Sequence, residues 1–196
     1  RRDMFITANV NEGEIYTLGE VRVTGDTIIP LEEAEKLVMV REGQVFSRRM
    51  LEYTSDAITA VLGNIGYAFA EVTPVPGLDR ENRTVAINFF VEPGPRVQVR
   101  RISFTGNTRT ADEVLRREMR QFEGAWFSQA AVDRSKIRLQ RLGFFETVEV
   151  ESKPVSGRPD QVDVVMKVKE RNSGSFVFGL GYQQLYGMTA SVQLSE

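Results

Sequence analysis

The stretch from Val99 to Ser128 reads VRRISFTGNTRTADEVLRREMRQFEGAWFS, and RLGFFETV follows it at 141–148. An extended apolar segment leads into a Gly-Asn turn, a short helix, a Glu-Gly break, a second helix and a Gly-Phe-Phe exit. The same order of features occurs earlier in the chain, between Val21 and Tyr67. The sequence therefore predicts a repeated module.

Equivalent residues of the two copies are 81 positions apart up to the start of the second helix and 77 positions apart after it. The first set includes Val21/Ile102, Gly25/Gly106, Glu42/Glu123 and Ser47/Ser128, and the second includes Gly66/Gly143, Ile87/Val164 and Val91/Val168. The difference of four residues is about one helical turn. We therefore expect the second helix of the later copy to be one turn shorter, with its buried face preserved.

The pattern of each copy predicts the element order β-α-α-β-β. The predicted fold class is therefore α+β, with two modules in tandem. In each module we expect two helices on one face of a three-stranded mixed sheet. In the first copy, Pro30 is expected to begin the first helix, Gly43 to end it and Ser47 to cap the second helix. In the second copy, Thr110 and Glu113 have the spacing of a capping box.

A narrow sheet leaves strand edges exposed, and two segments are predicted to be edge strands, 68–75 and 146–155. Pro74 and Pro76 support the first assignment, because proline cannot serve a central strand. An exposed edge can pair with an extended segment of another protein through main-chain hydrogen bonds. The residues expected at these edges are Ala70, Val72, Val148 and Val150.

The predicted organisation is the end of a preceding module at 1–12, one module at 13–94, a second at 95–170 and a pair of strands at 171–196. The segment Pro93-Gly94-Pro95 is expected to be a semi-rigid junction. In the last part, Phe176, Phe178, Leu180 and Tyr182 fall on one face of a strand, and a turn is expected near residues 185–187. Two strands of this pattern fit either the opening hairpin of a membrane barrel or an amphipathic hairpin of a soluble sheet.

The composition excludes several kinds of catalytic site. The chain has no cysteine and no histidine, which rules out zinc-finger sites, Ser-His-Asp triads and Cys-His pairs. No phosphate-binding loop or metal-ligand spacing is present, so we expect no enzyme, no catalytic residue, no metal and no cofactor. Charge is divided between the modules: residues 13–94 hold 7 basic and 13 acidic residues, whereas 95–170 hold 15 and 11.

Arginines of the second module are the candidate partner-binding residues: Arg100, Arg101, Arg116, Arg117, Arg120, Arg134, Arg138 and Arg141. They fit a solvated helix face or a surface for an anionic protein or lipid layer. Nucleic acid is disfavoured, because no stacking aromatics are interleaved with the arginines. Trp126, the single tryptophan, is expected in the core between the helices, and the alternative is a partly exposed interface anchor.

Three segments carry a resemblance: SFTGNTRTADEVLRREMRQFEGAW, RLGFFETVEVE and PDQVDVVMKVKERNSGSFVFGLGY. Together they closely resemble the BamA family, the central subunits of the machinery that assembles β-barrel proteins in Gram-negative outer membranes. The modules resemble POTRA domains, specifically the fourth and fifth, and the last residues resemble the first strands of the barrel. The resemblance covers nearly the whole chain and is strongest from Val99 to Tyr182.

The resemblance implies a periplasmic scaffold in the outer membrane that receives unfolded β-barrel proteins and docks accessory lipoproteins. In the family the fifth domain docks a BamD-like lipoprotein, which by position implicates Glu123, Arg116, Arg117, Arg120 and Trp126. Outer-membrane lipids are a further expected partner. A two-partner secretion or TamA-like transporter and a division scaffold carrying a POTRA domain remain alternatives.

Overall fold

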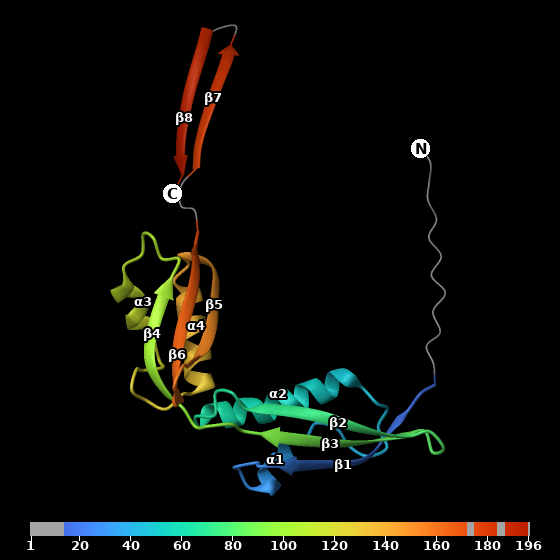
Figure 1. Ribbon diagram of the computed structural model, residues 1–196. Helices are drawn as coiled ribbons and strands as arrows, with labels where there is room; N and C mark the ends of the chain where they lie inside the picture. Colours follow the sequence, from blue (N-terminus) through green and yellow to red (C-terminus); the bar gives the residue numbers. More distant parts are fainter. Residues whose placement is uncertain (1–13, 172–174, 184–186, 196) are drawn as a thin grey trace, which may run out of the picture.

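The computed structural model describes residues 14–171, 175–183 and 187–195. Two modules of the same β-α-α-β-β order follow one another, and a two-stranded hairpin lies beyond the second (Figure 1). The strand end that we predicted at 1–12 lies outside the described residues. The mixed α+β fold expected from the sequence is confirmed for both modules.

The first module contains β1 (Thr17–Gly25), α1 (Leu31–Leu37), α2 (Arg48–Asn64), β2 (Glu71–Asp79) and β3 (Thr84–Glu92). The second contains β4 (Gln98–Thr105), α3 (Asp112–Glu118), α4 (Gln129–Arg141), β5 (Phe145–Val155) and β6 (Arg158–Glu170). The strand orders are β1-β3-β2 and β4-β6-β5. The central strand of each sheet is parallel to the first strand and antiparallel to the second.

The two long helices differ in length as the repeat offset predicts, with 17 residues in α2 and 13 in α4. Apolar side chains recur at helical spacing on the buried face of α2, at Leu51, Ile58 and Leu62. In α4 the corresponding positions are Val132 and Leu139. Removal of one turn therefore leaves both helices with a continuous apolar face against their sheets.

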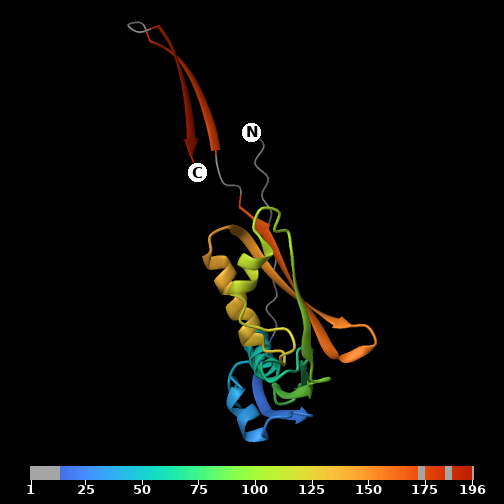
Figure 2. The same cartoon turned by 90° about the vertical axis from the view of Figure 1, so that its left-hand side faces the viewer.

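Each module has its own hydrophobic core between the sheet and the helices, which cover one sheet face (Figure 2). Alternate residues of the central strands enter these cores, as expected for a sheet with one covered face. The fully buried side chains include Ile87, Phe89, Leu62, Val164, Met166 and Phe127.

Two predicted helix boundaries are wrong. Helix α1 ends at Leu37, because the chain becomes extended at Val38, and Gly43 instead forms a later turn with φ of 82°. Helix α3 begins after Ala111 without a side-chain cap. The capping-box prediction fails because the N–H of Thr110 donates to Glu170 Oε1 at 2.7 Å, so this segment is held by β6.

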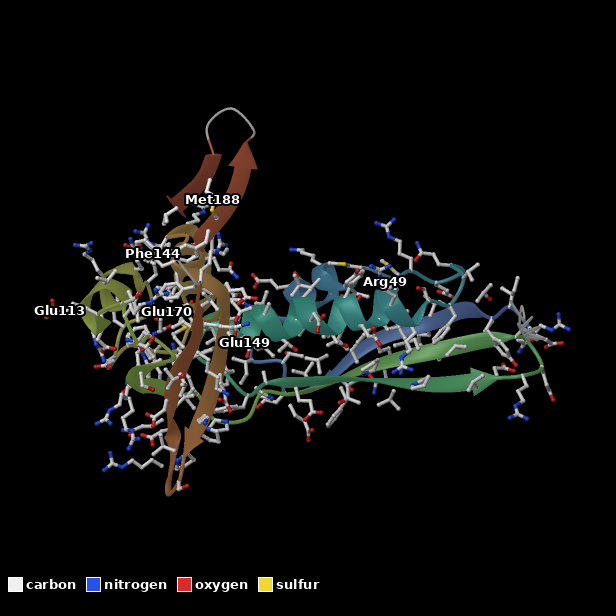
Figure 3. The ribbon with its side chains drawn as sticks, turned by 90° about the horizontal axis from the view of Figure 1, so that it is seen from above. Arg49, Glu113, Phe144, Glu149, Glu170 and Met188 are labelled. Carbon is white, nitrogen blue, oxygen red and sulfur yellow. The ribbon has the colours of Figure 1, made fainter. Side chains whose placement is uncertain are left out.

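The module junction is a set of direct contacts between the end of α2 and the start of the second module. The carboxamide oxygen of Asn64 accepts a hydrogen bond from the N–H of Ala130, in the first turn of α4, at 2.7 Å. The N–H of Val97 donates to the carbonyl of Gly66 at 2.9 Å. Ala68 packs against the core of the second module. In Figure 3, the C-terminal end of α2 faces the second module, and Arg49 lies near the N-terminal end of the helix.

The last two described strands, β7 (Ser175–Gln183) and β8 (Gly187–Ser195), pair antiparallel as a hairpin. The backbone register pairs Phe176, Phe178, Leu180 and Tyr182 with Leu194, Val192, Ala190 and Met188. Phe178 is 75% exposed and Met188 is 82% exposed. The turn expected near residues 185–187 falls largely outside the described residues. Among the residues that the structure describes, no helix is long and apolar enough to cross a membrane.

Candidate functional site

Glu123 and Arg116, two of the predicted partner-binding residues, meet at the outer edge of β4. Glu123 Oε1 accepts hydrogen bonds from the N–H of Ile102 at 2.7 Å and from Arg116 Nη1 at 3.3 Å. Arg116 Nη2 donates to the carbonyl of Ile102 at 3.0 Å. The Ile102 N–H is the main cause that lowers the pKa of Glu123, and Arg116 adds to it. The two side chains thus occupy both main-chain groups that Ile102 turns to the sheet edge.

The Glu-Gly-Ala-Trp loop covers the beginning of this edge. The N–H of Val99 donates to Ala125 at 2.9 Å, and the carbonyl of Val99 accepts from Gly124 at 2.6 Å. The N–H of Phe127 donates to the carbonyl of Val97 at 3.1 Å. The edge of β4 is therefore occupied by its own module from its start to Ile102.

The prediction that Trp126 lies in the core is wrong, because its side chain is 45% exposed. The guanidinium of Arg96 lies over its ring at 4.2 Å from the centroid. Arg96 Nε also donates to the carbonyl of Ile65 at 2.8 Å. Trp126 is therefore at the module junction, apart from the α3 face, and sequence reasoning missed Arg96 because a single arginine after Pro95 carries no recognisable pattern.

The predicted arginines do not form one surface. Four of them, together with Ile137, line a surface pocket of about 360 Å³ on α4, to which the segment after α3 contributes Arg120: Arg120, Arg134, Arg138 and Arg141. Arg138 also pairs with Glu118 at 2.6 Å. Arg117 is exposed on α3. Arg100 instead pairs with Asp163 of β6, with Nε to Oδ1 at 2.8 Å.

The strands β2 and β5 lie at sheet edges, as the sequence predicted. Ala70 is a correction: it precedes β2, which begins at Glu71, and it packs against the core of the first module. Val72 and Val148 are buried, at 8% and 3% exposure, and Val150 packs partly against the core. At these edges, therefore, the main-chain groups of these residues, rather than their side chains, are available to an added strand.

Glu170, at the end of β6, forms a site that sequence reasoning missed (Figure 3). Its carboxylate accepts from the Thr108 hydroxyl at 2.7 Å, from the Arg109 N–H at 3.1 Å and from the Thr110 N–H. The hydrogen bond from Thr108, helped by those from the main chain, lowers the pKa of Glu170 to about 2. The Gly-Asn-Thr loop before α3 is thereby fixed to the strand that leads toward the hairpin.

No group of three or more potential metal ligands occurs in the described part of the chain. The polar sites are hydrogen-bonded structural contacts and arginine-lined surfaces. They can hold an extended chain, an acidic protein surface or an anionic headgroup.

Comparisons with known proteins agree with this arrangement. The POTRA family model, described as a surface antigen variable number repeat, matches residues 16–94 and 97–171. The chain is 36% identical to the outer membrane protein assembly factor BamA of Neisseria meningitidis serogroup B over 97% of its own length and 24% of that protein.

The similar solved structures include two from Haemophilus species. One is BamA POTRA3-5 of Haemophilus influenzae, with a TM-score of 0.78, 45% identity and coverage of 82% of this chain and 63% of that chain. The other is BamA of Haemophilus ducreyi lacking POTRA domains 1-3, with a TM-score of 0.68, 44% identity and coverage of 91% and 34%. This chain spans about a quarter of the length of the Neisseria relative. From the fold of both modules and the match of the family model to each of them, we conclude that the chain belongs to the POTRA family.

Proposed function

We propose that this chain is the periplasmic, membrane-proximal part of an outer-membrane protein assembly factor, with the modules as its fourth and fifth POTRA domains. It receives unfolded β-barrel proteins and docks accessory lipoproteins. The observation that carries the proposal is the similarity to BamA over 97% of the chain, at 36% identity. The transporter and division-scaffold alternatives are not favoured, because the relatives at this identity are assembly factors.

A chimera tests this function. Residues 14–171 replace the corresponding modules of the Neisseria assembly factor in cells depleted of their own copy. We expect the chimera to restore folded outer-membrane proteins, measured by their heat-modifiable migration on gels. A chimera that reaches the membrane in normal amounts but restores none of them contradicts the proposal.

We propose that the exposed α3 face docks a BamD-like lipoprotein. Arg117 on α3 and Arg120, two residues after the helix at the rim of the α4 pocket, suit an acidic partner surface, and Glu123 and Arg116 hold α3 against β4. Arg117→Glu with Arg120→Glu should weaken lipoprotein binding at least tenfold, about 1.4 kcal/mol, without changing the melting temperature.

Arg80→Glu is the matched control, because this exposed arginine lies in the β2–β3 turn of the other module. Unchanged lipoprotein affinity in the double variant, measured by calorimetry, contradicts the assignment of the α3 face. A charge reversal at Glu123 is a weaker test, since it also removes the Ile102 contact.

Outer-membrane lipid headgroups are the second proposed partner, at the pocket lined by Arg120, Arg134, Ile137, Arg138 and Arg141. Arginine clusters attract anionic headgroups, and salt screens that attraction. Binding to vesicles that contain anionic phospholipid should fall as salt rises. Salt-independent binding contradicts this proposal.

The hairpin β7–β8 is proposed to begin the outer-membrane barrel. Strands of nine residues and an exposed apolar face, including Phe178, Met188 and Val192, support this role. An environment-sensitive dye at Phe178→Cys, in a second chimera that carries residues 14–195, should report an apolar surrounding in membranes. A spectrum typical of water contradicts it.

A further inference from the structure

The four sheet edges of the two modules differ in whether they can accept another strand. The edge of β4 is occupied as far as Ile102 by the 123–127 loop and by the Glu123 and Arg116 contacts with Ile102, which leaves only its last three residues. The first half of β1 is covered in the same way, because the N–H of Leu18 donates to Gln44 and its carbonyl accepts from Gly43, both at 2.7 Å. A register shift between Leu18 and Val21 leaves only a short remainder of β1.

The edge of β2 lacks hydrogen-bond donors at its two central outward positions, Pro74 and Pro76. Its pairing with β3 is continuous from Glu71 to Asp79, so successive residues turn alternately toward β3 and toward the open edge. Pro74 and Pro76 have no N–H, and their pairs with Phe89 and Ile87 must therefore be the non-hydrogen-bonded kind. Both prolines thus occupy positions whose main chain faces the open edge. Prolines at such positions block pairing with an added strand.

The edge of β5 has the same alternation but keeps its donors. Pro154, opposite Val162, must again be in a non-hydrogen-bonded pair, and the register is continuous back to Thr147. The main chains of Val148, Val150 and Ser152 therefore face the open edge, each with an N–H. The free run is bounded by the register shift after Phe145 and by Pro154. Figure 2 shows that the β5–β6 turn projects away from the helices.

We propose that β5, between Thr147 and Lys153, is the edge of this unit that binds unfolded client segments, and that β2 binds none. The inference rests on the proposed function and names the surface that performs it. On the helix side, an added strand lies beside Val148 and Val150; on the other side it lies beside the exposed Glu149. The occupant is thus an extended segment in which apolar residues alternate with polar or basic ones, the pattern of barrel strands.

Photo-cross-linking on the purified 196-residue chain tests the proposal directly. A photoreactive amino acid replaces Glu149 on β5 or Thr73 on β2, both of which are exposed. The probe is a urea-denatured eight-stranded outer-membrane protein diluted into buffer. We expect a cross-link from position 149 and none above background from position 73. Equal cross-linking at both positions, or cross-linking at 73 alone, overturns the proposal.

Proline substitutions distinguish main-chain strand pairing from non-specific adhesion of the denatured client. Ser152→Pro removes an edge N–H without removing a bond to β6, and it should lower the cross-link at 149 by roughly tenfold. Conversely, the double variant Pro74→Val with Pro76→Thr restores two donors to β2 and should gain a cross-link at 73. An unchanged yield in both variants overturns the proposal.

Amide hydrogen exchange gives a readout that does not depend on a folding-sensitive variant. In the free chain the amides of Val150 and Ser152 should exchange faster than those of Glu149 and Glu151, and the denatured client should slow them. If the client slows no β5 amide while the 14–171 chimera still restores outer-membrane proteins, the edge assignment fails and the proposed function stands. If the chimera also fails, both are contradicted.

Discussion

Glu170 shows how much one carboxylate can organise at a strand end. It is the acceptor for a hydroxyl and two main-chain N–H groups of the loop before α3. Arg109 Nη2 also donates to the carbonyl of Arg171 at 2.7 Å, and the N–H of Arg171 donates to the carbonyl of Phe144. The end of the second module is therefore tied together from three chain segments.

Glu170→Gln should make the free energy of unfolding less dependent on pH in the acid range. The folded-state pKa of Glu170 is about 2, below the ordinary 4.5. Its ionised contacts therefore stabilise the fold fully above pH 4.5 and progressively less as pH falls toward 2. The urea midpoint of the variant should lie below that of the parent chain. This difference should be largest at pH 7 and smaller at pH 3.

The exposed Glu149→Gln is the control for removing one negative charge from the second module. An equal loss at pH 7 and pH 3 in Glu170→Gln would show that the charge of Glu170 is not what holds the loop.

Helices α2 and α4 are coupled end to end by a cap that crosses the module boundary. Ser128 Oγ accepts from the Ala131 N–H at 3.4 Å, and Asn64 of the first module satisfies the Ala130 N–H. The last residue of α2 thus completes the first turn of α4, where main-chain donors otherwise lack partners. The stability of the second module depends on a side chain of the first.

Asn64→Ala should destabilise the second module by about 1 kcal/mol, the usual cost of a lost helix cap. Trp126 is the single tryptophan, so its fluorescence during urea unfolding reports on this module. Asn64→Asp keeps an acceptor at a helix N-terminus and should retain the stability. A shift confined to the first module, followed by tyrosine signals, would contradict the coupling.

The repeat offset let the sequence predict the order of elements, the difference in helix length and the edge positions of β2 and β5. These follow from local periodicity and from proline chemistry. The helix ends at Leu37 and Ala111 were not predictable, because partners distant in sequence decide them: Thr110 is bound by Glu170, about 60 residues away.

The candidate sites were harder to predict than the fold for the same reason. The sequence grouped Arg116, Arg120 and Trp126 because they are neighbours along the chain, whereas the structure separates them into an edge contact, a pocket and the junction. Side-chain direction depends on packing between elements, which a single sequence does not record. Glu170 had no local signal beyond its place at the end of an alternating strand.

The molecule as a whole consists of two modules held at a fixed junction, with an acidic first module and a basic second one (Figure 1). Main-chain bonding between Gly66 and Val97, the Asn64 cap and the Arg96 stack on Trp126 all cross the boundary. Gly66 is required there, since its φ is 110° and an added Cβ would lie 2.8 Å from Arg96 Cγ. The contacts leave little freedom for rotation between the modules.

Arg96→Ala with Asn64→Ala should therefore widen the range of angles between the modules. Spin labels at Arg49→Cys and Glu113→Cys report on this range, because the chain has no native cysteine. We expect a narrow distance distribution in the parent chain and a broader one in the double variant. Equal widths would show that the side chains of Asn64 and Arg96 do not restrict the angle.

The position of β6 between β4 and β5 has a mechanical consequence. A tension applied at Glu170, along the direction in which the chain continues, is parallel to β6. The hydrogen bonds of β6 to β4 and to β5 are then loaded together in shear. Neither strand pair can be opened one hydrogen bond at a time. The second module is thereby suited to transmit a pulling force from its last residue to its entire sheet without unravelling.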